Sequence, residues 1–428
     1  MSFSKISLRT LERTDNTVSI DESVTGILFD YCKYGNVFNG YPLAEACFGN
    51  GEVQCINNLK EASSFGITAN GIMNGVPYYH LQEFYEYIGD DAPIYVSFAN
   101  CSENFDAIVK MQIATNGKLF QIGVWTEQDI WSYDEENGYC LTNLIGKVGV
   151  QSKKINENGS LNDVNHCPFS LIVCANTNHI EGVGSVDYNA IPEIKSLEFP
   201  KVSVILGQNG STTLHAMQNG NNDKCPIGML GIVLALVYKA PAEESIAYVG
   251  KYNLNEYERF QNPELGFGAN YSPIDKINTY RKYLLCQKGY IIPVSYKATE
   301  SDVFLSDDQT LSNKDFSTLS MNRIVHKCRR VIRSAMLPYI NDSVYIDYTT
   351  GQLSSTSTSI IVNEIINLID AYMVNGNGSP QIDGRNVSVD VEQNVLYGDK
   401  LKIDTIIVPI ESAESITFEE TYNLFENS

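Results

Sequence analysis

Hydrophobic positions between residues 321 and 410 follow first the period of two helices and then the period of two strands. From 321 to 336 the apolar side chains recur every three or four residues, the spacing of one helix face. Ser320 precedes this run as a candidate N-cap, and Pro338 predicts its end, because proline cannot continue a helix. A second stripe of the same period predicts a helix over residues 359–374.

Two stretches after these helices alternate apolar and polar residues, which is the period of a strand with one buried face. The first covers residues 387–391 and the second covers residues 401–410. A turn rich in glycine and asparagine, residues 375–384, separates them from the second helix. Helix, helix, strand and strand make a compact unit that has a β edge.

The first of these helices carries basic residues on the face opposite its apolar stripe: Arg323, Lys327, Arg330 and Arg333. No acidic residue lies between 321 and 340, although the whole chain has a net charge of -21. Exposed helices usually carry both acidic and basic side chains, because like charges one turn apart repel each other. Two interpretations stay open, namely an ordinary solvated face and a surface for an acidic partner.

Upstream, short apolar strands alternate with helical stretches, a pattern typical of mixed α/β layers. Strands are predicted at residues 92–99, 119–125, 171–175 and 202–206, and the core begins at residue 24. Helices are predicted at residues 57–64, 80–88 and 105–114. The apolar run at 227–238 is too short to cross a bilayer and predicts a buried strand or helix.

The C-terminal part of the chain resembles the C-terminal domain of contractile tail sheath proteins, which belong to contractile phage tails and related injection systems. The matching segments occur in the order and spacing of that domain. They are residues 323–340, 344–347 (Val-Tyr-Ile-Asp), 350–351, 387–392, 393–396 and 399–409. Weaker matches lie at residues 24–29, 84–87 and 89–96, and none was found between 103 and 262.

The resemblance implies an α+β fold with a mixed-sheet core formed by both chain ends. Residues 20–102 would be its first segment, residues 263–410 its C-terminal segment, and residues 103–262 an inserted α/β domain. Extended arms are expected at residues 1–19 and 411–428. The resemblance also implies that Arg323, Lys327, Arg330 and Arg333 face an acidic patch on a tube protein.

Both chain ends alternate like strands but have no hairpin partner beside them in sequence. The N-terminal stretch consists of Lys5, Ile6, Ser7 and Leu8, and the C-terminal one includes Ile416, Thr417, Phe418 and Tyr422. Unpaired strand edges in water are usually blunted or used for pairing. We expect these arms to pair with neighbouring subunits, on an acceptor strand formed by Leu401, Lys402, Ile403, Asp404, Thr405, Ile406, Ile407 and Val408.

Composition narrows the possible functions. Of 428 residues, 43% are hydrophobic and 19% are charged, as in a globular protein with a large core. The acidic net charge argues against nucleic acid as the main partner, since phosphate binding needs a basic surface. The first residues lack the apolar centre of a secretion signal, so we expect synthesis in the reducing bacterial cytoplasm.

Local motifs for catalysis or metal binding are missing. The ten cysteines include no CxxC pair, and the five histidines lack the paired spacing of a zinc site. Residues 207–212 are rich in glycine but lack the lysine and spacing of a phosphate-binding loop. We therefore expect no cofactor, no metal and no catalytic residue.

The resemblance implies a helical homopolymer of stacked hexameric rings around an inner tail tube, which contracts to drive the tube through a target envelope. Expected partners are further copies of the chain, the tube protein, and baseplate and tail terminator proteins, with no nucleic acid and no membrane insertion. The expected location is a virion tail or an injection-system particle. Two other classes stay open: another virion component, such as a capsid or baseplate protein, and an enzyme whose site is assembled from distant segments.

Overall fold

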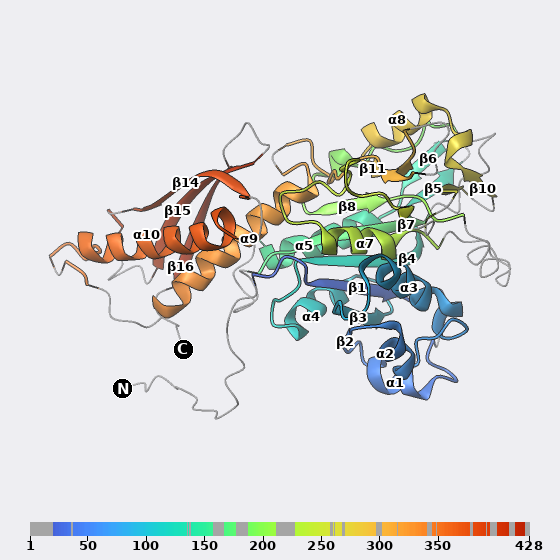
Figure 1. Cartoon of the computed structure of the whole chain (residues 1–428), viewed down its shortest axis with the longest axis horizontal. Coiled ribbons are helices and arrows are strands. Elements are labelled where there is room, and N and C mark those ends of the chain that lie inside the picture. The colour runs from blue at the N-terminus through green and yellow to red at the C-terminus, as the bar shows by residue number, and fades with distance from the viewer. Residues whose placement is uncertain are drawn as a thin grey trace. The chain divides into compact units, whose positions relative to one another are not determined.

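The computed structural model describes residues 20–423 (Figure 1). Within that range the gaps are residues 36, 135, 137, 157–166, 177–186, 211–226, 257–259, 261, 268–269, 297–301, 315, 340–344, 348, 377–379, 391, 394–399 and 411–415. The chain divides into two compact units. We call Asp21–Arg323 the sheet unit, and Ile324–Ser428 together with Met1–Ile20 the C-terminal unit.

A seven-stranded sheet forms the centre of the sheet unit. Its strands in spatial order are β11 (Tyr290–Ile291), β8 (Val202–Ile205), β7 (Ser170–Asn176), β4 (Gln121–Asp129), β1 (Thr25–Asp30), β3 (Ile94–Ala99) and β2 (Gln54–Ile56). All neighbours are parallel except β2, which runs antiparallel to β3. Parallel strands covered on both faces are almost continuously apolar, and every residue of β1 and β7 is buried.

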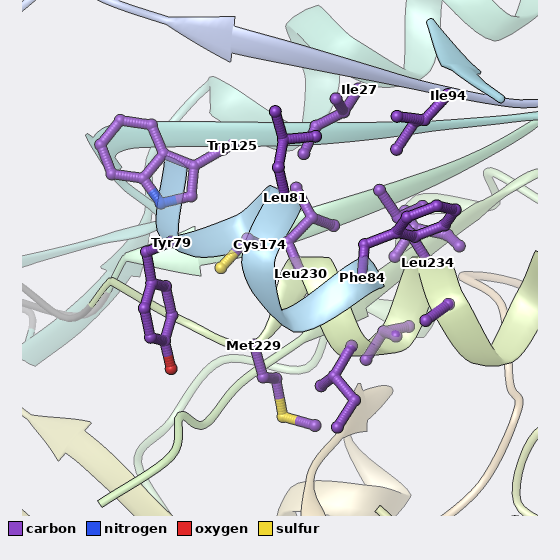
Figure 2. Packing of buried hydrophobic residues seen from close by; sticks show 14 of the residues in the cluster. Ile27, Tyr79, Leu81, Phe84, Ile94, Trp125, Cys174, Met229, Leu230 and Leu234 are labelled. Carbon is purple, nitrogen blue, oxygen red and sulfur yellow. The ribbon is translucent and has the colours of Figure 1, made fainter. Parts of the chain in front are cut away.

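Helices cover both faces of this sheet. One hydrophobic cluster joins Ile27 and Phe29 of β1 to α3 (Val76–Ile88) and α7 (Leu230–Lys239), as Figure 2 shows for part of it. A second cluster packs the intervening Leu28 with α4 (Asp106–Ala114) and α5 (Leu144–Asn156). Successive side chains of a strand point to opposite faces, so the two clusters lie on opposite sides of the sheet.

Two glycines allow α7 to approach its neighbours closely. A Cβ atom at Gly231 would lie 2.2 Å from the backbone oxygen of His80 in α3. A Cβ atom at Gly123 in β4 would lie 2.7 Å from the side chain of Leu234. A backbone oxygen cannot move aside easily, so only glycine fits at position 231 of α7, whereas a Cβ at position 123 would require the Leu234 side chain to shift. This helix is the apolar run predicted at residues 227–238.

The sheet unit also contains shorter elements. Its other helices are α1 (Pro42–Phe48), α2 (Leu59–Ser64) and α8 (Thr279–Gln287), with 3-10 turns at Ile72–Gly75, Lys195–Leu197 and Ile274–Lys276. Its antiparallel strand pairs are β5 (Trp131–Asp134) with β6 (Gly138–Leu141), β9 (Glu264–Phe267) with β10 (Asn270–Pro273), and β12 (Pro293–Val294) with β13 (Phe304–Leu305).

The C-terminal unit contains most of α9 (Leu319–Met336), which begins in the sheet unit. After a 3-10 turn at Leu337–Tyr339 come α10 (Ser355–Ile369) and a π-helical turn at Asp370–Val374. A three-stranded antiparallel sheet follows, in the order β14 (Ile382–Val389), β15 (Lys400–Pro409) and β16 (Ile416–Asn423). The buried residues of α10 include Ile361, Ile365 and Ile369, which share one face of the helix.

Both predicted helices of this region are confirmed, and both begin earlier than predicted. Thr318 rather than Ser320 caps α9, since its hydroxyl oxygen accepts from the Met321 N–H at 3.2 Å. Ser354 caps α10 through a 3.2 Å bond from the Ser357 N–H. The two predicted strands correspond to β14 and β15.

A large mixed sheet is confirmed, but the predicted inserted domain is wrong. β4, β7 and β8 lie within residues 103–262, yet they continue the sheet that contains β1 and β3. Residues 263–323 also belong to the sheet unit, so the C-terminal unit starts only at Ile324. Hydrophobic patterns identify strands, but they do not show which strands pair, because pairing joins segments far apart in the chain.

Candidate assembly elements

The basic residues of α9 are buried. Their exposed fractions are 0% for Arg323, 8% for Lys327, 0% for Arg330 and 7% for Arg333. Both interpretations left open by the sequence place these side chains on an exposed face, and their burial contradicts that placement, since the helix buries its polar face as well as its apolar one. Contact of these four side chains with a tube protein stays a prediction, and it would require that they first become exposed.

Arg323 has a defined set of partners inside the sheet unit. Its guanidinium donates to the backbone oxygens of Val237 at 3.0 Å, Ala240 at 2.8 Å and Pro241 at 3.2 Å. It also donates to the backbone oxygen of Glu22 at 3.4 Å. The last carbonyl groups of a helix have no partners within the helix and carry partial negative charge. Arg323 therefore caps the C-terminal end of α7.

This cap places a positive charge inside the sheet unit. Burial lowers the pKa of Arg323, and the carboxylates of Glu22, Glu243 and Asp308 act in the opposite direction. Arginine nevertheless stays protonated in proteins. Its hydrogen bonds go to neutral carbonyl groups, so the charge is held by oriented dipoles at the end of a helix.

The three-stranded sheet brings together the predicted acceptor strand and the predicted C-terminal arm. β16 pairs with β15 from Ile416 opposite Ile407 to Asn423 opposite Lys400. β14 occupies the other edge of β15. The acceptor residues 401–407 and the arm residues 416–422 therefore pair within one chain, whereas Val408, among the described residues, pairs only with β14. Pairing of this arm with a neighbouring subunit stays a prediction, and the N-terminal stretch 5–8 lies outside the described residues.

The strand order of the sheet unit points to one further position. If the parallel strands β1, β3, β4, β7, β8 and β11 are numbered 1 to 6 along the chain, their order across the sheet is 2-1-3-4-5-6. In doubly wound sheets of this order, ligands bind beyond the carboxyl ends of the strands, beside the first strand, where the order reverses. Asp30, the last residue of β1, lies at that position.

The carboxylate of Asp30 holds strand ends together. Its Oδ1 accepts from the N–H groups of Cys32 at 3.0 Å and Cys101 at 2.9 Å. Its Oδ2 accepts from the Thr126 hydroxyl and the Gln128 amide, both at 2.7 Å. The donors come from β4 and from the residues that follow β1 and β3. Both carboxylate oxygens of Asp30 thus accept hydrogen bonds from protein donors. These bonds offset the cost of burying a charged group.

The thiol beside Asp30 is poorly suited to nucleophilic chemistry. Burial and the neighbouring charge of Asp30 raise the pKa of Cys32 to about 12. Because the thiolate is the reactive form, a thiol with this pKa is almost entirely protonated near neutral pH. The geometry around Asp30 therefore supports a structural role.

A buried histidine, which the sequence does not single out, connects α3 to the first turn of α7. The Nδ1 atom of His80 accepts from the Gly231 N–H at 3.2 Å, so its Nε2 carries the proton and donates to the Ile227 oxygen at 3.1 Å. The indole N–H of Trp125 donates to the same oxygen at 2.7 Å. His80 thus supplies an acceptor that the helix start lacks, just as Arg323 supplies donors at its end.

The described ranges contain no group of three or more His, Cys, Asp or Glu side chains placed to hold a metal ion. Every cysteine that lies within the described residues is a free thiol. Among the helices of the same ranges, none combines the length and hydrophobicity needed to span a membrane.

Solved structures match this chain over nearly its whole length. The sheath tail protein of Listeria innocua gives a TM-score of 0.53 at 10% identity, covering 94% of this chain and 95% of that one. The helical sheath of the anti-feeding prophage in its contracted state gives 0.50 at 12% identity, covering 97% and 98%. This chain has the fold of contractile tail sheath proteins.

This chain also matches a chain of the anti-feeding prophage baseplate. The TM-score is 0.50 at 12% identity, and the match covers 94% of this chain and 93% of that one. No protein-family model matches the sequence, and no curated protein matches it. The resemblance of the C-terminal sequence to sheath proteins is thus confirmed at the level of the fold.

Proposed function

We propose that this chain is the structural subunit of a contractile tail sheath. Subunits polymerise into stacked hexameric rings around an inner tube, and contraction of the polymer drives the tube through a target envelope. The observation that supports this most strongly is the match to a contracted sheath over 97% of this chain and 98% of the other. Such coverage includes the sheet unit and the C-terminal unit alike.

In this proposal the C-terminal strand links neighbouring subunits. β16 pairs with β15 along the full length of the strand, and β15 of a second copy offers the same register. Because a backbone hydrogen bond contributes only about 1 kcal/mol net, exchanging one partner strand for an identical one changes the free energy little. Residues 5–8 form the second arm, and repeated pairing along the polymer holds subunits together during contraction.

The tube protein is the second proposed partner. In this proposal Arg323, Lys327, Arg330 and Arg333 contact the tube, after these buried side chains become exposed. An acidic tube surface would then attract them, and the attraction would weaken as salt screens the charges. A sheath that releases its tube at high salt is the expected behaviour.

Baseplate and tail terminator proteins meet the two ends of the polymer. The particle is a virion tail or an injection system, assembled from protein made in the bacterial cytoplasm. The proposal involves no catalytic residue, cofactor, metal, nucleic acid or membrane insertion.

Electron microscopy of the purified full chain, alone and after co-expression with a candidate tube protein, tests this function. Tubes or stacks of rings are expected in at least one of these samples. Closed shells, or monomers that persist in both, would contradict the proposal and favour another virion component. A baseplate component is the second candidate because one match comes from a baseplate structure, and single rings that never stack would support it.

A further inference from the structure

Helix α8 lies at one edge of the seven-stranded sheet and exposes two tyrosines. The chain runs from α8 into β11, which is the edge strand, and the two elements pack together. Leu285 is the buried residue of this helix. Tyr280 and Tyr283 are 60% and 56% exposed, and their spacing of three residues puts them on one helix face. Tyrosine is enriched in protein–protein interfaces, so this face has the composition of a binding surface.

The first turn of α8 is basic as well as aromatic. Residues 276–299 contain five basic residues and no acidic one, in a chain whose net charge is -21. Asp187 and Glu193 lie near Lys288, which follows the last turn of the helix. Charges of both signs therefore meet after the end of α8, whereas its first turn carries positive charge alone. We call the exposed or half-buried residues of this turn the basic edge: Tyr280, Arg281, Lys282 and Tyr283.

The opposite edge of the same sheet is formed by β2. The Tyr85 hydroxyl, in the last turn of α3, donates to the Ile56 oxygen of β2 at 2.7 Å. The turn after α3 is attached at the same place, since the Asp91 N–H donates to the Asn57 oxygen at 3.0 Å. In Figure 1, α8 and β11 lie on one side of the sheet, and β2 lies with α1 and α2 on the other. The end of α3 therefore belongs to the edge that is remote from α8.

This second edge is acidic. Residues 41–91 contain seven acidic residues and one basic residue, Lys60. Glu86, Asp90 and Asp91 are exposed at and just after the end of α3, and we call these three residues the acidic edge. The sheet unit therefore carries opposite charges at the two edges of its central sheet.

Both sets of charges are unfavourable for the helix on which they lie. A helix has partial positive charge at its N-terminus and partial negative charge at its C-terminus. Arg281 and Lys282 occupy the first turn of α8, which has no acidic residue. Glu86 lies in the last turn of α3, which has no basic residue, and Asp90 follows shortly after. The stability of the sheet unit therefore does not account for these charges, whereas binding of a partner does.

Opposite charges at two edges of one body fit a head-to-tail contact between identical copies. Such a contact joins two different surfaces, and it closes into a ring when the rotation between copies allows it. A symmetric contact of either edge with itself would instead bring like charges together, which is costly. Charge complementarity thus favours a second copy of this chain as the partner of α8.

We infer that the basic edge of one copy binds the acidic edge of the next, so that the sheet units of neighbouring copies contact each other directly. Within a sheath ring this contact rests on the proposed function, and it acts besides the pairing of β16. The contact itself needs only the free chain in solution and can be tested without tubes.

Reversal of the charges on either edge tests the contact. The first variant combines Arg281→Glu with Lys282→Glu, and the second combines Glu86→Lys with Asp90→Lys. Both variants should fold, because each places the new charges favourably on its helix. Asp91 is left unchanged, since its φ of 72° is a conformation that aspartate adopts more readily than lysine.

Sedimentation velocity of the full chain at low salt measures the association. The wild type should associate, and it should do so more weakly as salt screens the charges. Each variant alone should associate about ten-fold more weakly or worse, because like charges then face each other. An equal mixture of the two variants should regain the association, since alternating copies bring opposite charges together at every contact.

The matched control combines Lys110→Glu with Lys153→Glu. These lysines are exposed on α4 and α5, which cover one face of the sheet, and their reversal changes the net charge as much as the first variant does. The control should associate like the wild type. An equal loss in the control, wild-type association of either variant alone, failure of the mixture to regain it, or a wild type that stays monomeric at every salt concentration would overturn the inference.

Photo-crosslinking of the otherwise unchanged chain decides the question if a reversed variant does not fold. The residue is introduced as Tyr283→p-benzoylphenylalanine, and a mixture of isotope-labelled and unlabelled chains identifies crosslinks between copies. These crosslinks should map to residues 86–91. Crosslinks between copies that map elsewhere, or none at all, would contradict the contact.

The two proposals fail separately. A chain that associates through these edges but never forms tubes or stacked rings would contradict the sheath function and leave the contact intact. Normal tubes formed by each reversed variant alone would contradict the contact and leave the sheath function intact.

Discussion

The seven-stranded and the three-stranded sheet differ in how their neighbouring strands are connected along the chain. In the seven-stranded sheet, β1 pairs with β3 and β4, which are separated from it by helices and many residues. In the three-stranded sheet, neighbours follow one another directly along the chain, from β14 to β15 to β16. The first arrangement buries each inner strand between two others and under helices. The second leaves its last strand attached through one neighbour.

This difference indicates which part of the molecule can exchange partners. Removing β4 or β7 from the large sheet would expose two strand edges and both hydrophobic clusters. Removing β16 would expose only one edge of β15. A strand at the end of a chain, paired on one side, is therefore the element that can move to another subunit at small cost. In the proposed assembly the sheet unit would provide stability and the small sheet would provide the connection between subunits.

The largest effect is expected from deleting residues 413–428, which removes β16. The sheet unit should keep its structure, because its strands and clusters do not include these residues. Assembly should be abolished, since the linking strand is gone. Electron microscopy measures assembly, and hydrogen exchange in β4 and β7 measures the sheet unit. Tubes formed by the deleted chain would show that β16 is not the link.

A core substitution should destabilise the sheet unit strongly. Leu234 is fully buried in α7 against β4, so Leu234→Ala should lower the free energy of unfolding by about 2–5 kcal/mol. The control is Ile360→Ala on the exposed side of α10, where the change should stay within about 0.5 kcal/mol. Denaturant unfolding followed by tryptophan fluorescence suits the first variant, since Trp125 lies in the same cluster (Figure 2). Equal effects of the two substitutions would contradict the placement of Leu234 in a tightly packed core.

The smallest effect concerns an ion pair on the surface of the sheet unit. Lys154 in α5 donates to Asp106 in α4 at 2.6 Å, and this bond lowers the pKa of Asp106. A lowered pKa in the folded state means that the ionised form stabilises the fold above the unfolded pKa, and that this stability is lost as pH falls through the folded pKa. Both side chains are more than 40% exposed, so Asp106→Asn should cost less than about 0.5 kcal/mol at pH 7.

Unfolding of wild type and Asp106→Asn at pH 7 and at pH 3 measures this effect. The difference between the two proteins should shrink at the lower pH, where the wild-type carboxylate takes up a proton. A difference that grows as the pH falls would mean that Asp106 acts through another group.

Much of the local structure follows from the sequence. The helical period at residues 321–336 and the alternation at 401–410 predict α9 and β15 closely. The apolar run at residues 227–238 predicts a buried element, although not that it is a helix. Such patterns are local, because a helix or strand repeats every two to four residues and its apolar face has to meet a core. The alternation near residue 416 likewise marks β16.

Tertiary structure alone decided the surroundings of these elements. The four carbonyl groups around Arg323 come from positions 82 to 301 residues away in sequence, and backbone carbonyls leave no trace in a sequence pattern. His80 meets Gly231 across 151 residues for the same reason. The basic stripe of α9 predicted a surface because charge is costly to bury without partners. For Arg323 those partners exist only once the first turn of α9 has packed beside the end of α7, which is why periodicity identified the helix and could not identify its environment.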